Sequence, residues 1–207
     1  MSTVETPATL PVKLPRLTPK SDRSLESALK ERRSVRAYSH ESLTRGELAQ
    51  LLWAAQGITG PDGLRTAPSA GALYPLEVSV VAGLVDGLPS GIYRYEAERH
   101  ELVLVEEGDR RGELRAAALG QEYVETGAAV IALAAVYART SGKYGKRGIR
   151  YVHMEVGHAA QNVWLQATAL GLGTVVVGAF DDGPVKRILG LARDEEPLCL
   201  MPVGRLP

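Results

Sequence analysis

The sequence predicts an α+β fold in which helices pack against a β-sheet. Helical and strand-like patterns are mixed along the chain without the regular alternation that marks parallel βαβ units. Residues 92–95 and 102–105 are β-favouring runs joined by a short polar turn, so they predict a hairpin. Residues 128–137 are apolar nearly throughout, which is typical of a strand buried on both faces. These three observations favour α+β over a doubly wound α/β fold.

The composition indicates a globular domain without a strong overall charge. The chain has 207 residues, of which 45% are hydrophobic and 23% charged, and it carries 24 basic and 24 acidic side chains. Such a balance provides no global field for nucleic acid or an anionic membrane. A single cysteine, Cys199, excludes an intrachain disulfide and a cysteine-based zinc site, and its apolar neighbours predict burial. With no signal-peptide pattern and no membrane-spanning run, we expect a cytoplasmic protein.

Local signals place the remaining elements. Prolines at 7, 11, 15 and 19 disfavour a helix in residues 1–22, which predicts an extended N-terminal arm before a domain spanning 23–207. Ser24 begins the first predicted helix. Thr44 and Glu47 form a capping box for the second, which we expect to end at Gly57. Further helices are expected at 110–119, 150–170 and from 182, and further strands at 76–82, 174–177 and 198–203.

A basic cluster, Arg32-Arg33-Ser34-Val35-Arg36, follows the first predicted helix. Three guanidinium groups and a hydroxyl within five residues suit a phosphate dianion, because arginine offers several donors in a fixed geometry and stays charged. Arginines at the C-terminal end of a helix also complement its dipole. Composition alone leaves both interpretations open and slightly favours the second.

Two loops contain small residues that would let a flat ligand approach the backbone. The first is Arg65–Ala72, and the second is the turn Val177–Asp181 after a predicted core strand. A hydrolase hypothesis would make Ser69 a nucleophile, but the flanking glycines of a nucleophile elbow are absent. Each loop alone is also compatible with an ordinary connection.

Three patterns that resemble known sites are rejected on spacing. His153 and His158 flank Glu155, but they are five residues apart, which places them about 140° apart on a helix and disfavours a shared metal. Gly171-Leu172-Gly173 follows a helix and precedes a strand, the reverse of a dinucleotide-binding turn. The segment 142–146 lacks the spacing of a phosphate-binding loop.

Lys143 and Tyr144 form a candidate pair for proton transfer. Residues 139–150 contain five basic side chains and no acidic one, so mutual repulsion would lower the pKa of a lysine there. A solvated basic loop is an equally good interpretation of the same segment.

Taken in order, these motifs resemble one family. The basic cluster, then Pro-Ser-Ala-Gly-Ala-Leu-Tyr-Pro at 68–75, Gly-His-Ala-Ala-Gln-Asn at 157–162, Val-Gly-Ala-Phe-Asp at 177–181 and the terminal Gly204-Arg205 resemble the nitroreductase family. The likeness is to its SagB-type dehydrogenase branch, which includes azoline oxidases, and it runs from about Ser24 to Arg205. It implies a mixed, mainly antiparallel sheet flanked by helices, and a homodimer with FMN at each subunit interface.

The resemblance assigns roles by position. It places Gly178 and Ala179 against the reactive part of the flavin ring, where many members have a glutamate in place of Gly178. Ala70 and Ala72 replace polar residues that many members carry, so ring contacts would depend more on the backbone. The residues implied to bind the phosphate and ribityl chain are Arg32, Arg33, Ser34, Arg36 and Arg205, and those implied to contact the flavin from the other subunit are Pro68, Ser69, Ala70 and Gly71.

The same resemblance implies a ping-pong oxidoreductase with tightly bound FMN. NAD(P)H-dependent reduction of nitro or quinone-type acceptors is the first expectation. Dehydrogenation of thiazoline or oxazoline rings in a modified peptide is the alternative, because Lys143-Tyr144 resembles the catalytic lysine–tyrosine pair of azoline-dehydrogenating members. A flavin-binding protein without turnover is a third hypothesis.

Overall fold

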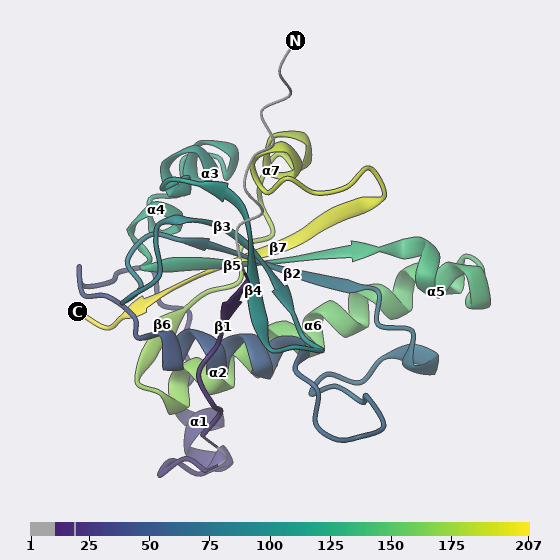
Figure 1. Cartoon of the computed structure of the whole chain (residues 1–207), viewed down its shortest axis with the longest axis horizontal. Coiled ribbons are helices and arrows are strands. Elements are labelled where there is room, and N and C mark those ends of the chain that lie inside the picture. The colour runs from purple at the N-terminus through teal and green to yellow at the C-terminus, as the bar shows by residue number, and fades with distance from the viewer. Residues whose placement is uncertain (1–10, 19) are drawn as a thin grey trace.

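The computed structural model describes residues 11–18 and 20–207. Its centre is an antiparallel seven-stranded sheet in the order β1-β4-β3-β2-β5-β7-β6 (Figure 1). The predicted α+β class is therefore confirmed. The strands are β1 (Val12–Lys13), β2 (Leu76–Ala82), β3 (Gly91–Glu96), β4 (Glu101–Glu107), β5 (Ala129–Val136), β6 (Leu172–Thr174) and β7 (Glu195–Arg205). The helices are α1 (Leu25–Glu31), α2 (Arg45–Gln56), α3 (Arg111–Ala117), α4 (Tyr123–Thr126), α5 (Tyr137–Tyr144), α6 (Arg147–Ala169) and α7 (Asp182–Ile188), with a 3₁₀ turn at Ala70–Ala72.

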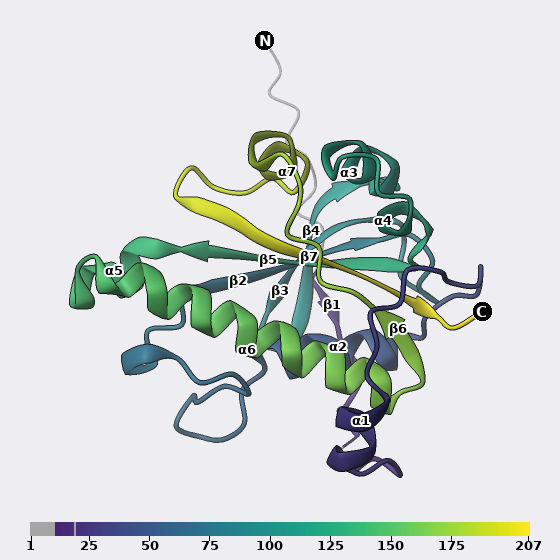
Figure 2. The same cartoon turned by 180° about the vertical axis from the view of Figure 1, so that it is seen from behind.

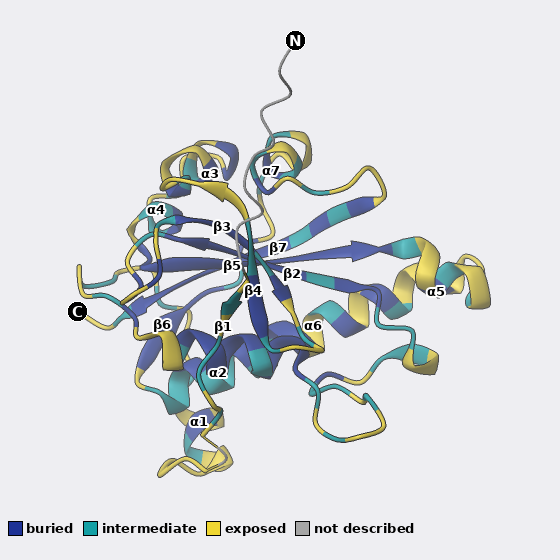
Figure 3. Cartoon of the chain, in the orientation of Figure 1, coloured by how far each residue is buried: buried dark blue, intermediate teal, exposed yellow. Residues whose placement is uncertain are grey.

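Two helical layers cover the sheet. Helices α1, α2 and α6 lie on one side of it and α3, α4 and α7 on the other (Figures 1 and 2). Every residue of β5 is buried, as the apolar run predicts (Figure 3). Its side chains alternate between two cores, with Ile131 and Leu133 in the core under α2 and α6, and Val130 and Ala132 in the core under α3, α4 and α7.

The long helix α6 organises the first layer. Its 23 residues span about 35 Å at 1.5 Å per residue. Helix α1 packs near its C-terminal end, and α5 packs near its N-terminal end. Gly148 allows the second contact, because a Cβ atom there would lie 2.7 Å from the backbone of Ser141. The same helix therefore connects two distant regions of the subunit.

Three details differ from the sequence prediction. The basic segment 139–150 is mainly helical rather than a loop, because α5 extends to Tyr144 and α6 already begins at Arg147. Helix α5 begins after Val136 without a side-chain cap, so no start signal was visible in the sequence. The strand expected at 174–177 is displaced to β6, and Val177 forms only an isolated bridge with Leu200. The four-residue helix α4 was not expected.

The described part of the N-terminal arm is extended, as its prolines predict. Strand β1 pairs with β4, and the ring nitrogen Nε2 of His100 lies 3.2 Å from the carbonyl oxygen of Pro15. The buried Gln50 amide exchanges two hydrogen bonds with the backbone of Thr18, at 3.0 and 3.2 Å. The prolines at 7 and 19 lie outside the described residues, and the boundary at residue 22 stays a prediction.

Two further expectations concern burial and membrane insertion. Cys199 is buried, and desolvation raises the pKa of its thiol to about 12, so it is a small core side chain. Within residues 11–18 and 20–207, each helix is too short or too polar to cross a bilayer.

Candidate flavin site

The basic cluster at residues 32–36 leads into a segment held against the C-terminal part of the sheet. The Val35 amide donates to the carbonyl oxygen of Thr174 at 3.0 Å. Two glycines make room for this segment, since a Cβ atom at Gly173 would lie 2.6 Å from the Val35 side chain, and one at Gly204 would lie 2.8 Å from the ring of Tyr38. These close approaches fix the path of the segment that presents the cluster.

Arg32 carries an unmet hydrogen-bonding requirement. Its guanidinium group lies over the indole ring of Trp164, 4.4 Å from the ring centroid. Its Nη1 atom is buried and has no hydrogen-bond partner among the described residues. A buried donor without a partner is costly, so an anion at this position would be favoured. This atom is the strongest sign in the cluster that a phosphate fits there.

Arg33 and Arg205 are already engaged within the subunit. Nη1 of Arg33 donates to the carbonyl oxygens of Lys30 and Arg32 at 3.0 and 2.7 Å, which satisfies the C-terminal end of α1. Arg205 forms two hydrogen bonds of 3.1 Å with the carboxylate of Glu47. A structural role therefore accounts for the contacts of both arginines, and their predicted role in phosphate binding stays a prediction.

Ser34 and Arg36 are exposed beside them. The backbone of Ser34 bridges to Thr174, and the guanidinium group of Arg36 lies 5.7 Å from the ring centroid of Tyr123. Arg36 forms no ion pair with a described residue. Its charge is therefore available for a ligand.

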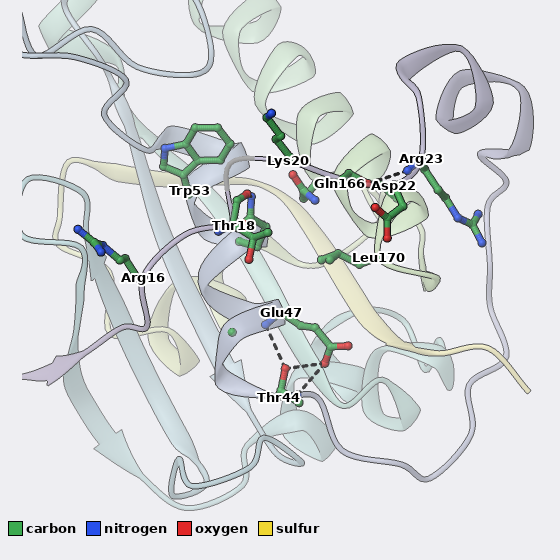
Figure 4. A pocket seen from close by; sticks show the side chains of 14 residues that line it. Arg16, Thr18, Lys20, Asp22, Arg23, Thr44, Glu47, Trp53, Gln166 and Leu170 are labelled. Atoms are coloured by element: carbon green, nitrogen blue, oxygen red, sulfur yellow. Dashed lines mark hydrogen bonds between the residues drawn. The ribbon is translucent and has the colours of Figure 1, made fainter.

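A cavity of about 680 Å³ lies next to the Arg205–Glu47 pair rather than at the cluster itself. Figure 4 shows Thr44 and Glu47 at one end of it, with Trp53, Gln166 and residues of the N-terminal arm around the rest. None of the residues predicted to bind the flavin lines this cavity. This space is formed where the arm crosses α2 and the end of α6, so it is distinct from the predicted flavin site.

The turn at Gly178 and Ala179 has an open backbone. Both residues are exposed, and a Cβ atom at Gly178 would meet nothing within 4 Å. The carbonyl oxygen of Ala179 accepts a hydrogen bond of 2.8 Å from the Gln121 amide. The bridge between Val177 and Leu200 anchors the turn to the sheet. A planar ligand could therefore approach this backbone without a side chain in the way.

The loop that contains Pro68, Ser69, Ala70 and Gly71 lies against the predicted lysine–tyrosine pair. A Cβ atom at Gly71 would lie 2.7 Å from the hydroxyl oxygen of Tyr144 and 3.0 Å from Nζ of Lys143. The structure thus brings together two motifs that sequence reasoning treated separately. It also reveals partners that the sequence did not single out, since the guanidinium group of Arg65 lies 4.7 Å from the ring centroid of Tyr74. We found no sequence signal for this contact.

These two groups of residues lie toward opposite ends of α6. Arg32 packs on Trp164, whereas the ring of Tyr144 packs edge-on against Tyr151, with centroids 5.2 Å apart. Trp164 lies thirteen positions after Tyr151, or about 20 Å along the helix. The basic cluster and the loop at Gly71 therefore do not meet within one subunit.

The two histidines on α6 differ in exposure from the glutamate between them. His153 and His158 are exposed, whereas Glu155 between them is buried. Among the described residues, no group of three potential metal ligands comes together. That the two histidines share no metal stays a prediction from their spacing.

Comparison with known proteins identifies close relatives. The model of the nitroreductase family matches residues 29–205. A nitroreductase-family protein of Methanocaldococcus jannaschii is 51% identical over 181 residues, which cover 87% of this chain and 90% of that protein. A structure from Ralstonia eutropha is 28% identical with a TM-score of 0.84, covering 98% of this chain and 92% of that one. A structure from Anabaena variabilis is 35% identical with a TM-score of 0.79, over 88% of this chain but only 38% of that one.

Two more distant structures share the fold. A chain of the Escherichia coli microcin synthetase complex, with truncated pro-MccB17 bound, has a TM-score of 0.73 at 21% identity, covering all of this chain and 79% of that one. The NADPH:FMN oxidoreductase of Vibrio harveyi, complexed with NAD⁺, has a TM-score of 0.63 at 21% identity, over 87% of this chain and 68% of that one. At this identity the likeness concerns the fold alone.

Proposed function

Because the chain belongs to the nitroreductase family, we propose that it is an FMN-dependent oxidoreductase whose flavin is bound between two subunits. The observation that carries this proposal is the buried Nη1 atom of Arg32, which has no partner among the described residues and lies in the same short segment as the exposed Arg36. A phosphate group would accept a hydrogen bond from Nη1 of Arg32 and neutralise part of the charge of Arg36. Gly178 and Ala179 offer their open backbone to the ring.

The separation of the two groups along α6 supports a homodimer. A twofold axis across α6 would place the basic cluster of one subunit near the Gly71 loop of the other. Exposed apolar side chains provide a surface for this contact, with Leu25 and Leu29 on α1 and Ile149 and Met154 on α6. The side of the molecule that carries α1 and α6 faces the viewer in Figure 2. Each flavin would then take residues from both subunits.

Bound FMN would supply two-electron chemistry, taking a hydride from NAD(P)H and passing the electrons to a nitro or quinone-type acceptor in a ping-pong sequence. The chain's own residues hold the phosphate, present open backbone to the ring and place Lys143 and Tyr144 beside the loop. The fold shared with the Vibrio NADPH:FMN oxidoreductase supports the choice of donor. A cytoplasmic location is part of the same proposal.

The decisive experiment is anaerobic reduction of the purified protein. We expect a yellow sample with a flavin absorption spectrum that NAD(P)H bleaches and that an added nitro or quinone compound restores. A colourless protein that does not bind added FMN would overturn the proposal. Flavin that binds but is not reduced by NAD(P)H would favour the third hypothesis, a flavin-binding protein without turnover.

A second candidate function is azoline dehydrogenation. The contact between Gly71 and the Lys143-Tyr144 pair favours it, because it places a basic group and a hydroxyl at the loop proposed to face the flavin. In this function Lys143 would remove a proton from the ring of a modified peptide. The fold shared with the microcin synthetase complex, which holds truncated pro-MccB17, supports a peptide substrate. The trifolitoxin operon protein TfxC of Rhizobium leguminosarum is also similar, at 24% identity over 85% of this chain and 54% of that protein.

A further inference from the structure

The loop Arg65–Tyr74 is held in a conformation that its residues do not favour. Three of its residues have positive φ angles, with 68° at Gly71, 55° at Ala72 and 45° at Tyr74. Only glycine adopts this region freely, so Ala72 and Tyr74 are strained. Strained backbone persists only where surrounding groups determine it. The position of Gly71 beside Lys143 therefore depends on contacts from outside the loop.

Several of these contacts come from neighbouring helices. Nη1 of Arg139 on α5 donates to the carbonyl oxygen of Tyr74 at 3.1 Å, and the Asn162 amide on α6 donates to that of Thr66 at 3.2 Å. Within the loop, the hydroxyl oxygen of Ser69 accepts a hydrogen bond of 2.9 Å from the Tyr74 amide. Because Ser69 is the acceptor in this bond, its own proton is free to donate to a group beneath the loop.

Glu155 is the group beneath the loop. It is 2% exposed and lies beside Ser69, Arg65 and Gln56. Burial raises the pKa of this carboxyl, although these three neighbours act in the opposite direction. Its Oε1 atom and Nε2 of Gln56 both lack a partner at hydrogen-bonding geometry among the described residues. A carboxyl group in such a place is costly, so a purely incidental position on α6 does not explain it.

We propose that Glu155 is a positioning residue that accepts the Ser69 hydroxyl proton in a hydrogen bond and so fixes the strained loop carrying Gly71 against Lys143 and Tyr144. The role of this geometry in flavin chemistry rests on the proposed function. The effect of Glu155 on the loop conformation is independent of the proposed function, because it concerns contacts within the chain. Arg65 compensates the carboxyl group from the start of the loop.

The first test is hydrogen exchange of residues 65–74 in flavin-free, full-length protein. We expect Glu155→Ala to accelerate exchange in this segment about two- to tenfold, as the loss of one net hydrogen bond implies. Glu155→Gln retains an acceptor oxygen and should restore near-native exchange. Glu101→Gln is the matched control, since Glu101 is also buried but lies on β4 against Lys13 and Arg99. Unchanged exchange in Glu155→Ala, or equal acceleration in both Glu155 variants, would overturn the proposal.

The second test identifies Ser69 as the intermediary. Ser69→Ala should accelerate exchange of the same segment, and the Glu155→Ala/Ser69→Ala double variant should add little beyond either single change. Additive effects would overturn the link through Ser69. In flavin-loaded protein, Glu155→Ala should also alter the visible circular dichroism of the bound ring, with recovery in Glu155→Gln. If the wild-type chain binds no FMN, the proposed function fails while the exchange results still decide the role of Glu155.

Discussion

The basic side chains near the two ends of α6 differ in their interaction partners. Near the C-terminal end, Arg33 donates to carbonyl oxygens at the end of α1, and Arg32 lies over Trp164 with one buried donor that has no partner in the described part of the chain. At the N-terminal end, Lys143 and Lys146 form no ion pair with a described residue. The first end combines structural contacts with the proposed anion site, whereas the second carries lysines that pair with no acidic group among the described residues. If the dimer is as proposed, each flavin contacts one end of each type.

The largest expected effect comes from disrupting the proposed dimer, which would separate the basic cluster of one subunit from the Gly71 loop of the other. Met154 is 54% exposed on α6, so Met154→Glu would bury a charge in the proposed interface. We expect a folded monomer that has lost FMN, measured by light scattering and flavin absorbance. Val105→Glu is the control, because Val105 is an exposed apolar side chain on β4, 44% accessible. A stable dimer with bound FMN in Met154→Glu would show that this face is not the interface.

The next effect tests whether the N-terminal end carries chemistry. Lys143→Ala should lower azoline oxidation by about 100-fold or more, as expected when a general base is removed, and leave nitro reduction largely intact. Steady-state kinetics with both substrate classes would measure it. Lys146→Ala removes a nearby exposed cation and serves as the control. Equal loss of both activities in Lys143→Ala would contradict this division of roles.

A smaller effect is expected at the C-terminal end. Arg32→Ala and Arg36→Ala should each weaken FMN binding by about 1.5–3 kcal/mol, the usual contribution of a charge-assisted hydrogen bond. Equilibrium titration of the flavin-free protein would measure this. Arg187→Ala, which removes a basic residue from the last turn of α7, is the comparison for a helix-dipole role. Unchanged FMN affinity in both cluster variants would mean that the cluster only complements the helix dipole.

The smallest effect concerns the loop itself. Gly71→Ala and Gly63→Ala both place a side chain at positive φ, so each should reduce stability by roughly 1–2 kcal/mol. Only Gly71→Ala also brings a Cβ atom against Tyr144 and Lys143, because Gly63 has open space around it. The two variants should lose a similar amount of melting temperature. Turnover should nevertheless fall further in Gly71→Ala than in Gly63→Ala. Equal turnover in the two variants would mean that the contact has no functional consequence.

Much of the fold could be predicted because its signals are local. The capping box of Thr44 and Glu47, the stop at Gly57 and strand β2 all appear in the structure as expected. The displaced strand β6 was missed because pairing with β7 decides its limits, and that pairing is not visible in local sequence. Propensity is routinely overridden by such tertiary contacts.

The candidate site was predictable in its residue types but not in its arrangement. The ordered motifs identified the family, yet they did not show that Gly71 contacts Lys143 or that Glu47 pairs with Arg205. The sequence pattern distinguished Glu155 only by the histidines that flank it. Its burial beneath the loop depends on how α6 is rotated against the sheet, which the sequence pattern around it did not indicate.

The outer edges of the sheet are both closed by residues from the first part of the chain. Strand β1 pairs with β4 at one edge, and the backbone of Ser34 and Val35 lies beside β6 at the other. An uncovered edge strand is a template for strand addition by another molecule, so these short pieces protect the sheet against aggregation. They also pair with partners far downstream in the sequence. Closing both edges therefore depends on contacts between distant parts of the chain, which form more slowly than local ones.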